Sequence, residues 1–134
     1  NIFVATHDGE IVRTGDGCLL RNNGYFRADG GFAVRQGKVF ASLAAWQDAT
    51  GQEMLEGARV GFFADPRLRR PGGGGTIDDP ATLGAIAAYD PLPLSPLIGK
   101  GLDLRKVFGI DPGPADFRGA LPGNAADLGA LQHR

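Results

Sequence analysis

Short apolar runs alternate with glycine-containing turns along the first third of the chain, and the pattern repeats. Residues 1–4 (Asn-Ile-Phe-Val) align with residues 23–26 (Asn-Gly-Tyr-Phe) at an offset of 22 residues, and residues 12–13 (Val-Arg) fall on residues 34–35 (Val-Arg). A repeat of this size, made of strand-like pieces, is typical of stacked strands. It predicts three short strands in each unit: residues 2–5, 11–13 and 18–21, then 25–27, 32–35 and 39–41.

Like residues lie directly above one another in such a stack, in which neighbouring strands are about 4.8 Å apart. We therefore expect Phe3 and Tyr25 to form an aromatic ladder, and Asn1 and Asn23 to form an amide ladder. The Asp-Gly and Asn-Gly pairs between the runs are also strong hairpin signals. An antiparallel meander is the competing prediction, but the constant spacing of the repeat favours the stack.

A helix is expected where the repeat is interrupted. Residues 42–51 combine helical spacing of Leu43 and Trp46 with an N-cap residue, Ser42, and a C-terminal stop, Gly51. Trp46 is the only tryptophan of the chain. At this spacing, an aromatic side chain is more often a core anchor than a sugar-binding platform, so we expect it to be buried.

Strand and helix signals become sparser after residue 60. Residues 61–63 (Gly-Phe-Phe) match residues 24–26 (Gly-Tyr-Phe), which would place Phe62 on the aromatic ladder. We expect a last strand at residues 83–89 and a short helix at residues 103–108. The apolar side chains expected to anchor the C-terminal part are Leu104, Val107 and Phe108 of that helix and Phe117, Leu121, Leu128 and Leu131 of the tail.

Composition and charge argue against several kinds of partner. The net charge is -1, so there is no basic surplus for a nucleic acid or an anionic membrane surface. No apolar run approaches the roughly 18–20 residues of a membrane span. The single cysteine, Cys18, lies in an apolar run and is expected to be a buried, inert thiol. One cysteine and two histidines argue against a structural zinc site.

Three motifs in the last third of the chain carry a resemblance to a known superfamily. Residues 95–101 (Ser-Pro-Leu-Ile-Gly-Lys-Gly), 116–119 (Asp-Phe-Arg-Gly) and 127–132 (Asp-Leu-Gly-Ala-Leu-Gln) resemble C-terminal motifs of secreted right-handed parallel β-helix proteins of the pectate-lyase-like superfamily. Residues 42–47 and 50–53 are similar to a segment that such proteins carry between their last rungs. The order and spacing of these motifs agree with that superfamily.

The resemblance implies an all-β fold, a right-handed parallel β-helix with rungs of about 22 residues, an inserted short helix and an irregular C-terminal cap. It also implies that the chain is the C-terminal portion of a longer protein that is secreted, periplasmic or at the cell surface. We expect one domain. Its parts are two regular rungs at 1–42, a helical insertion at 43–56, the last rungs at 57–94 with a Gly-rich loop at 71–75, and a cap at 95–134.

Three functional hypotheses follow from this resemblance. The first is a non-catalytic end module whose parent protein acts on or binds polysaccharide. The second is part of a carbohydrate-active enzyme, such as a polysaccharide lyase, glycoside hydrolase or epimerase, whose site lies mainly in missing N-terminal rungs. The third is an adhesin or assembly module, because an exposed first rung can self-associate. The sequence offers several acids but no preferred pair for a hydrolase.

The candidate glycan-contacting residues are Arg13, Arg35 and Lys38, which lie on the repeat. The equivalence of Arg13 and Arg35 would stack like charges, so both side chains should face solvent. Three acids of the tail, Asp111, Asp116 and Asp127, could bind Ca²⁺, a cation that takes six to eight oxygen ligands. Turn and cap roles are the favoured interpretation of these three acids, and no other cofactor is expected.

Overall fold

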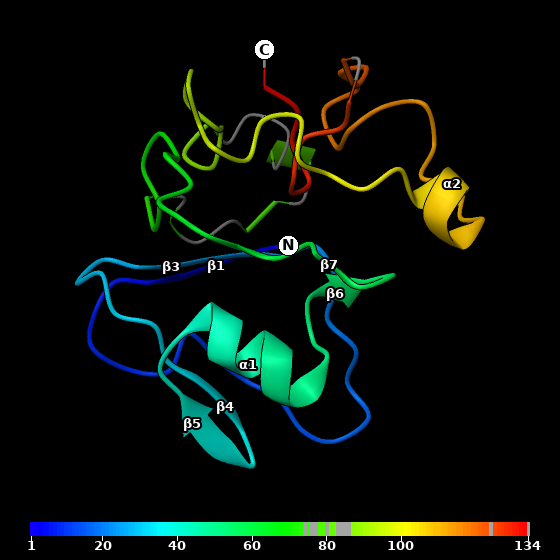
Figure 1. Ribbon diagram of the computed structural model, residues 1–134. Coiled ribbons are helices and arrows are strands. Elements are labelled where there is room, and N and C mark those ends of the chain that lie inside the picture. Colours follow the sequence, from blue (N-terminus) through cyan, green and yellow to red (C-terminus); the bar gives the residue numbers. More distant parts are fainter. Residues whose placement is uncertain (74, 76–77, 80, 83–86, 124, 134) are drawn as a thin grey trace. The chain divides into compact units, whose positions relative to one another are not determined.

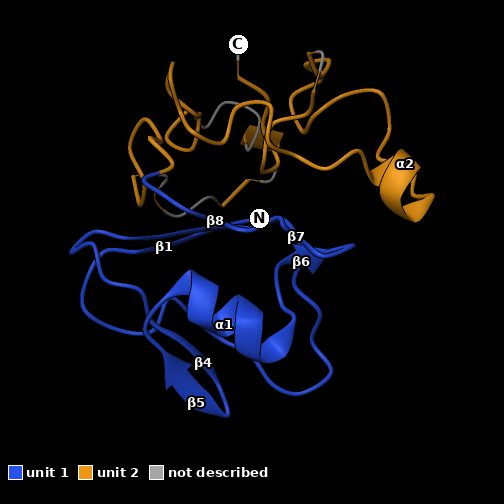
Figure 2. Cartoon of the chain, in the orientation of Figure 1, with its two compact units in different colours: residues 1–65 blue, residues 66–134 orange. Residues whose placement is uncertain are grey.

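The computed structural model describes residues 1–73, 75, 78–79, 81–82, 87–123 and 125–133 (Figure 1). Contacts within the chain divide it into two compact units, unit 1 at Asn1–Asp65 and unit 2 at Pro66–Arg134 (Figure 2). The strands of unit 1 are β1 (Ile2–Ala5), β2 (Val12–Arg13), β3 (Gly24–Arg27), β4 (Val34–Gln36), β5 (Lys38–Phe40), β6 (Met54–Leu55), β7 (Ala58–Arg59) and β8 (Phe62–Phe63), and its helix is α1 (Leu43–Thr50). Unit 2 contains the helix α2 (Leu104–Phe108).

The 22-residue repeat sets the register of two parallel strand pairs. β1 pairs with β3, placing Phe3 opposite Tyr25, and β2 pairs with β4 at the same offset. The rings of Phe3 and Tyr25 stack with centroids 5.4 Å apart and an angle of 17° between their planes. Nδ2 of Asn1 donates a hydrogen bond of 3.2 Å to Oδ1 of Asn23. The expected parallel register, the aromatic ladder and the amide ladder are therefore confirmed for the two copies of the repeat.

The prediction of a right-handed parallel β-helix is nevertheless wrong. The described residues form two three-stranded sheets, ordered β1-β3-β8 and β2-β4-β5, and one two-stranded sheet of β6 and β7. Two pairings, β4 with β5 and β6 with β7, are antiparallel. Residues 18–21, expected to supply a third strand, form none. A parallel coil needs every face to stack, and here the third face is missing, so the sheets do not close into a solenoid.

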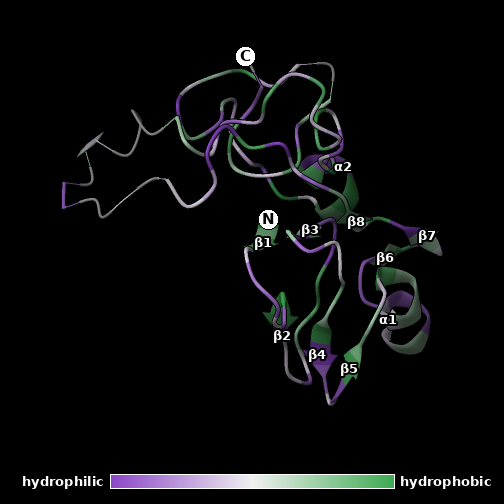
Figure 3. Cartoon of the chain, turned by 90° about the vertical axis from the view of Figure 1, so that its left-hand side faces the viewer, coloured by the Kyte–Doolittle hydropathy of each residue, from purple (hydrophilic) through white to green (hydrophobic). Residues whose placement is uncertain are grey.

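A tight turn at Gly37 explains why the second copy of the 22-residue repeat departs from a coil. Gly37 adopts a φ of 69°, a conformation that glycine reaches without steric cost. The turn sends the chain back along β4, so that Gln36 lies opposite Lys38. Figure 3 shows hydrophilic residues at this turn. The competing antiparallel prediction is therefore correct for β4 and β5, although their turn is Gln-Gly-Lys and not one of the Asp-Gly or Asn-Gly pairs.

The third position of the aromatic ladder is displaced by one residue from the prediction. Tyr25 lies opposite Phe63, not Phe62, and Phe62 lies opposite Gly24. Gly61 packs closely on the side chain of Glu53, since a Cβ at residue 61 would lie 2.7 Å from the Cβ of Glu53. This glycine is thus required for a close approach and is not the structural equivalent of Gly24.

A small aromatic core holds unit 1 together. Trp46 is fully buried on α1, and its ring meets that of Tyr25 edge-on at a centroid distance of 5.8 Å. Its Nε1 donates to Oε1 of Gln36 at 2.9 Å, which satisfies the indole N–H inside the core. The prediction that Trp46 anchors the core is confirmed. The buried members of this core are Tyr25, Phe32, Val34, Phe40 and Trp46.

Helix α1 forms where the sequence predicted it. The Oγ of Ser42 accepts from the backbone N–H of Ala45 at 3.1 Å, and Gly51 ends the helix with a φ of 70°. The expected N-cap and stop are both confirmed. Within the predicted insertion at residues 43–56, α1 ends at Thr50 and β6, the first strand of the β6–β7 hairpin, follows it.

A buried carboxylate fastens the β3 strand to the segment after α1. Glu53 is fully buried, and its carboxylate accepts from the backbone N–H of Asn23 at 3.1 Å, from Nδ2 of Asn23 at 2.5 Å and from the hydroxyl of Tyr25 at 2.7 Å. Three donors compensate the loss of hydration of the carboxylate. The core of unit 1 is therefore both aromatic and polar.

Unit 2 has much less regular structure among its described residues. Helix α2 is confirmed with the expected cap and stop: Oδ1 of Asp103 accepts from the N–H of Lys106 at 3.0 Å, and Gly109 has a φ of 67°. Its apolar face is not buried as predicted, because Leu104 is 37% and Phe108 44% exposed. A short helix of five residues therefore caps itself without joining a core.

Two apolar side chains of the tail that were expected to be buried are exposed instead. Phe117 and Leu121 are 59% and 73% exposed, whereas Leu128 is buried. Cys18 is exposed, contrary to the prediction of a buried thiol, because its segment forms no strand that could turn it inward. The predicted strand at residues 83–89 lies partly outside the described residues, and its described part, residues 87–89, is not a strand. No described helix is long and apolar enough to cross a membrane.

Candidate functional site

The parallel register of β2 and β4 brings two of the three predicted glycan-contacting residues together. Arg13 lies directly opposite Arg35, on the outer face of the β2-β4-β5 sheet. The alternate residue Val34 is buried in the core, and side chains alternate between the two faces of a strand. The side chains of Arg13 and Arg35 are 71% and 39% exposed, as expected for stacked like charges.

A carboxylate that the sequence reasoning left unassigned joins the two arginines. Oε2 of Glu10 accepts from Nε of Arg13 at 2.9 Å, and its Oε1 accepts from Nε of Arg35 at 2.5 Å. The hydrogen bond from Arg35, assisted by Arg13, holds the pKa of Glu10 below its ordinary value of 4.5. Glu10 thus reduces the repulsion between the arginines and fixes their separation. Its position three residues before Arg13 was the only sequence signal for this contact.

The third candidate, Lys38, belongs to the opposite face of the same sheet. Lys38 and Phe40 are two residues apart in β5 and therefore share one face of the strand. The Nζ of Lys38 lies 5.2 Å from the centroid of the Phe40 ring. Phe40 itself is buried in the core. The structure therefore separates Lys38 from the pair of arginines, which we call the Arg13–Arg35 row.

Turn and cap roles were favoured for the three acids considered for Ca²⁺, and each acid has a hydrogen-bond or ion-pair partner in the structure. Asp116 accepts through Oδ1 from the N–H groups of Arg118 and Ala120, at 2.8 and 2.7 Å. Asp127 accepts from the N–H of Gly99 at 2.7 Å. Asp111 pairs with Arg105 at 2.6 Å. Among the described residues, no three His, Cys, Asp or Glu side chains are grouped so as to hold a metal ion.

The three C-terminal motifs fold into one hydrogen-bonded block. The N–H of Leu128 donates to the carbonyl of Leu97 at 3.0 Å, joining the first motif to the third. The N–H of Gln132 donates to Oδ2 of Asp116 at 2.9 Å, joining the third motif to the second. Ser95 donates through Oγ to the carbonyl of Pro66 at 2.7 Å. These motif residues therefore have structural roles in unit 2.

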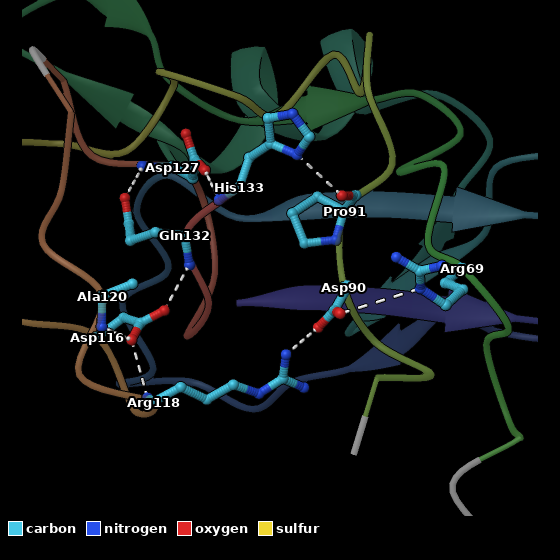
Figure 4. Close-up of polar contacts among 9 residues, drawn as sticks. All are labelled: Arg69, Asp90, Pro91, Asp116, Arg118, Ala120, Asp127, Gln132 and His133. Carbon is cyan, nitrogen blue, oxygen red and sulfur yellow. Dashed lines mark hydrogen bonds and ion pairs between the residues drawn. The ribbon is translucent and has the colours of Figure 1, made fainter. Parts of the chain in front are cut away.

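A pocket of about 160 Å³ lies beside this block, and Figure 4 shows its polar contacts. The carboxylate of Asp90, a lining residue, is paired with Nη1 of Arg118 and lies 4.0 Å from Nε of Arg69. Nδ1 of His133 is 3.1 Å from the carbonyl oxygen of Pro91. We call this the Asp90 pocket. It is lined by Arg69, Asp90, Pro91, Pro93, Arg118, Gln132 and His133.

Sequence reasoning did not assemble this pocket. In the sequence, Asp90-Pro91 repeats the Asp-Pro pair of residues 65–66 and His133 is next to last, and neither feature indicates a shared site. The lining comes from four segments that are far apart in the sequence: residue 69, residues 90–93, residue 118 and residues 132–133. No local spacing reveals such a set, and only the folding of unit 2 brings it together.

No family model matches the chain, and neither a curated protein nor a solved structure proved similar to it.

Proposed function

We propose that this chain is a non-catalytic module that binds acidic polysaccharide through the Arg13–Arg35 row. The observation that carries the proposal is the parallel register that places these two guanidinium groups side by side on an outer sheet face. Guanidinium groups recognise carboxylates through paired, charge-assisted hydrogen bonds. A row of two such groups suits a polymer that carries repeated carboxylates.

The geometry of Glu10 leaves the row able to bind. Glu10 contacts both arginines through their Nε atoms, and the row of two cations and one anion keeps a net positive charge. Each guanidinium also carries two Nη groups, which can donate to a ligand. Val39, opposite Arg35 on the neighbouring strand, is 46% exposed and extends this face with an apolar surface. Charged and apolar contacts together suit a sugar chain.

Binding of a polyuronate such as polygalacturonate tests the proposal. We expect the unmodified chain to bind it, and Arg13→Ala with Arg35→Ala together to lower the affinity by about tenfold or more, because two charge-assisted contacts are lost. Lys38→Ala removes one positive charge from the other face of the sheet, so it is the matched control for the single variant Arg35→Ala, which also removes one. Titration calorimetry measures all these affinities.

Two outcomes would overturn the proposal. Equal losses in the Lys38→Ala and Arg35→Ala variants, which each remove one positive charge, would show that net charge alone, and not the row, determines binding. Release of sugar fragments by the chain itself would show turnover and would favour the second hypothesis, part of an enzyme site. An assay of new reducing ends, made on the same mixtures, distinguishes binding from turnover.

The third hypothesis, self-association, is favoured by the position of β1. This four-residue strand lies at the edge of the β1-β3-β8 sheet, and an edge strand presents backbone groups that can pair with another chain. If this edge pairs with a second copy, light scattering will show mass rising with concentration. A constant monomer mass at high concentration would rule the assembly role out.

A further inference from the structure

The Asp90 pocket is formed within unit 2 by a short antiparallel ladder. The N–H of Arg69 donates to the carbonyl of Asp90 at 2.9 Å, and Leu68 and Pro91 form a bridge. This pairing places the side chains of Arg69 and Asp90 next to each other. The prolines at positions 91 and 93 supply rigid apolar rings beside them, because a proline ring has little freedom to move away.

The opposite side of the pocket is held by the C-terminal motifs. Asp116 positions the backbone of Arg118, whose side chain is only 14% exposed and is paired with Asp90. Oε1 of Gln132 accepts from the N–H of Asp127 at 2.9 Å, so its Nε2 group is the part that can donate to a ligand. Arg118 and Gln132 are therefore positioned by other contacts before any ligand arrives.

The two arginines differ in what they can offer. Arg118 is engaged by Asp90 at close range, whereas Nε of Arg69 is 4.0 Å from that carboxylate, beyond the usual range of an N–H···O hydrogen bond. The Arg69 side chain is also 58% exposed. Arg69 is thus the guanidinium that can turn its donors toward an incoming group without breaking a short ion pair.

The volume and the charge of the Asp90 pocket restrict which ligands it can bind. A volume of about 160 Å³ is below the roughly 300–1,000 Å³ of pockets for drug-sized ligands, so the pocket admits a small molecule but not an oligomer. The lining has two arginines and one carboxylate, an excess of one positive charge when His133 is neutral. A single negative charge is matched by this excess. A second negative charge would be repelled by Asp90.

We propose that the Asp90 pocket binds a small monocarboxylate, with the carboxylate on Arg69 and the apolar body of the ligand against Pro91 and Pro93. The carbonyl of Pro91 can only accept a hydrogen bond, so Nδ1 of His133 donates to it and the ring keeps a fixed orientation at the wall. Nε2 of Gln132 is a further donor for the ligand. This site is in unit 2 and does not depend on the Arg13–Arg35 row.

Propionate is the probe, and propionamide, which has nearly the same shape but no charge, is its control. We expect propionate to shift the NMR signals of the Gln132 side-chain amide and of the His133 ring in a saturable way. The dissociation constant should be on the order of 1 mM, as suits so few ligand atoms. Propionamide should cause no saturable shift over the same range, and inorganic phosphate should bind more weakly than propionate.

Substitutions of Arg69 test whether this residue contacts propionate. Arg69→Gln should weaken propionate at least about tenfold, whereas Arg69→Lys, which keeps the charge but loses the planar fork, should weaken it less. Arg70→Gln is the matched control, because Arg70 is the next residue, is also exposed and does not line the pocket. The double variant Arg13→Ala with Arg35→Ala should bind propionate unchanged, so failure here and failure of the proposed function remain distinguishable.

Three results would overturn the inference. Equal binding of propionamide would remove the role of charge, and tighter binding of phosphate would contradict the effect of Asp90. Unchanged binding by the Arg69→Gln variant would remove Arg69 from the site. Because Arg69 is exposed, we expect this variant to keep the melting temperature of the unmodified chain, and the Arg69→Lys variant gives a second reading if it does not.

Discussion

The two units of this chain are held together by different kinds of interaction. Unit 1 has parallel strand pairs around a buried aromatic core, with Trp46 and Tyr25 at its centre. In unit 2, side-chain carboxylates satisfy backbone N–H groups, as Asp116 and Asp127 do, and the described residues form one short helix and an isolated bridge. Apolar burial and strand pairing stabilise the first unit. Hydrogen bonds between separate chain segments define the second, in which apolar side chains such as Leu121 remain exposed.

The largest expected effect is the loss of the aromatic core. Trp46→Ala should lower the free energy of unfolding of unit 1 by about 3–5 kcal/mol, because it removes a buried side chain and leaves a cavity. Chemical denaturation followed by circular dichroism measures the change. Tyr89→Ala in unit 2 is the control, since Tyr89 is 44% exposed and its loss should cost far less. Similar costs at both positions would contradict the contrast between the units.

Removal of one carboxylate acceptor tests unit 2. Asp127→Asn should lower the free energy of unfolding by about 1–3 kcal/mol, because an amide cannot accept from the N–H groups of both Gly99 and His133. Denaturation measures this cost, and hydrogen exchange of the amide of Gly99 reports the lost bond directly. Asp16→Asn is the control at an exposed position, where a change within about 0.5 kcal/mol is expected. An unchanged exchange rate of the Gly99 amide would argue against its hydrogen bond to Asp127.

Alkaline pH should weaken the core of unit 1. Burial, and then the hydrogen bond to Glu53, raise the pKa of Tyr25 above its ordinary value of 10.0. The contribution to stability is therefore complete below about pH 10, where the unfolded tyrosine is also protonated, and is lost as the pH rises further. For one proton the loss approaches about 1.4 kcal/mol per pH unit.

A Tyr25→Phe variant isolates this effect. It has no hydroxyl to ionise at residue 25, so its stability should fall less steeply above pH 10 than that of the unmodified chain. Denaturant titrations at several alkaline pH values compare the two slopes. Equal slopes would mean that groups other than Tyr25 cause the alkaline loss.

The smallest expected effect is at the Arg13–Arg35 row. Because the pKa of Glu10 is held low, the contribution of its ion pairs is present above its ordinary value of 4.5 and is lost as the pH falls through the lowered value. Arg35→Ala should move the pKa of Glu10 back toward 4.5, since the hydrogen bond from Arg35 is the largest cause of the shift. An NMR titration of the Glu10 carboxylate measures this, and an unchanged pKa would contradict the bridge.

Prediction from the sequence succeeded where a local pattern was sufficient. Capping residues define both helices, since Ser42 and Asp103 each bond to a nearby backbone N–H. The repeat correctly gave the register of the parallel strands, because identical spacings bring like residues opposite each other. It failed for the fold class, because whether a third face stacks depends on segments such as residues 18–21, whose apolar character does not ensure a strand partner.

The sequence by itself determined the two helices, the parallel register and the pairing of Arg13 with Arg35, because each follows from spacing along a regular backbone. The tertiary structure decided which residues share a site. It placed Glu10 between two arginines, moved Lys38 to another face and joined Arg69, Asp90 and Arg118 around one pocket. Contacts of this kind join turns and chain segments without a common period. Their geometry is set only when the hydrogen bonds of the whole unit have formed.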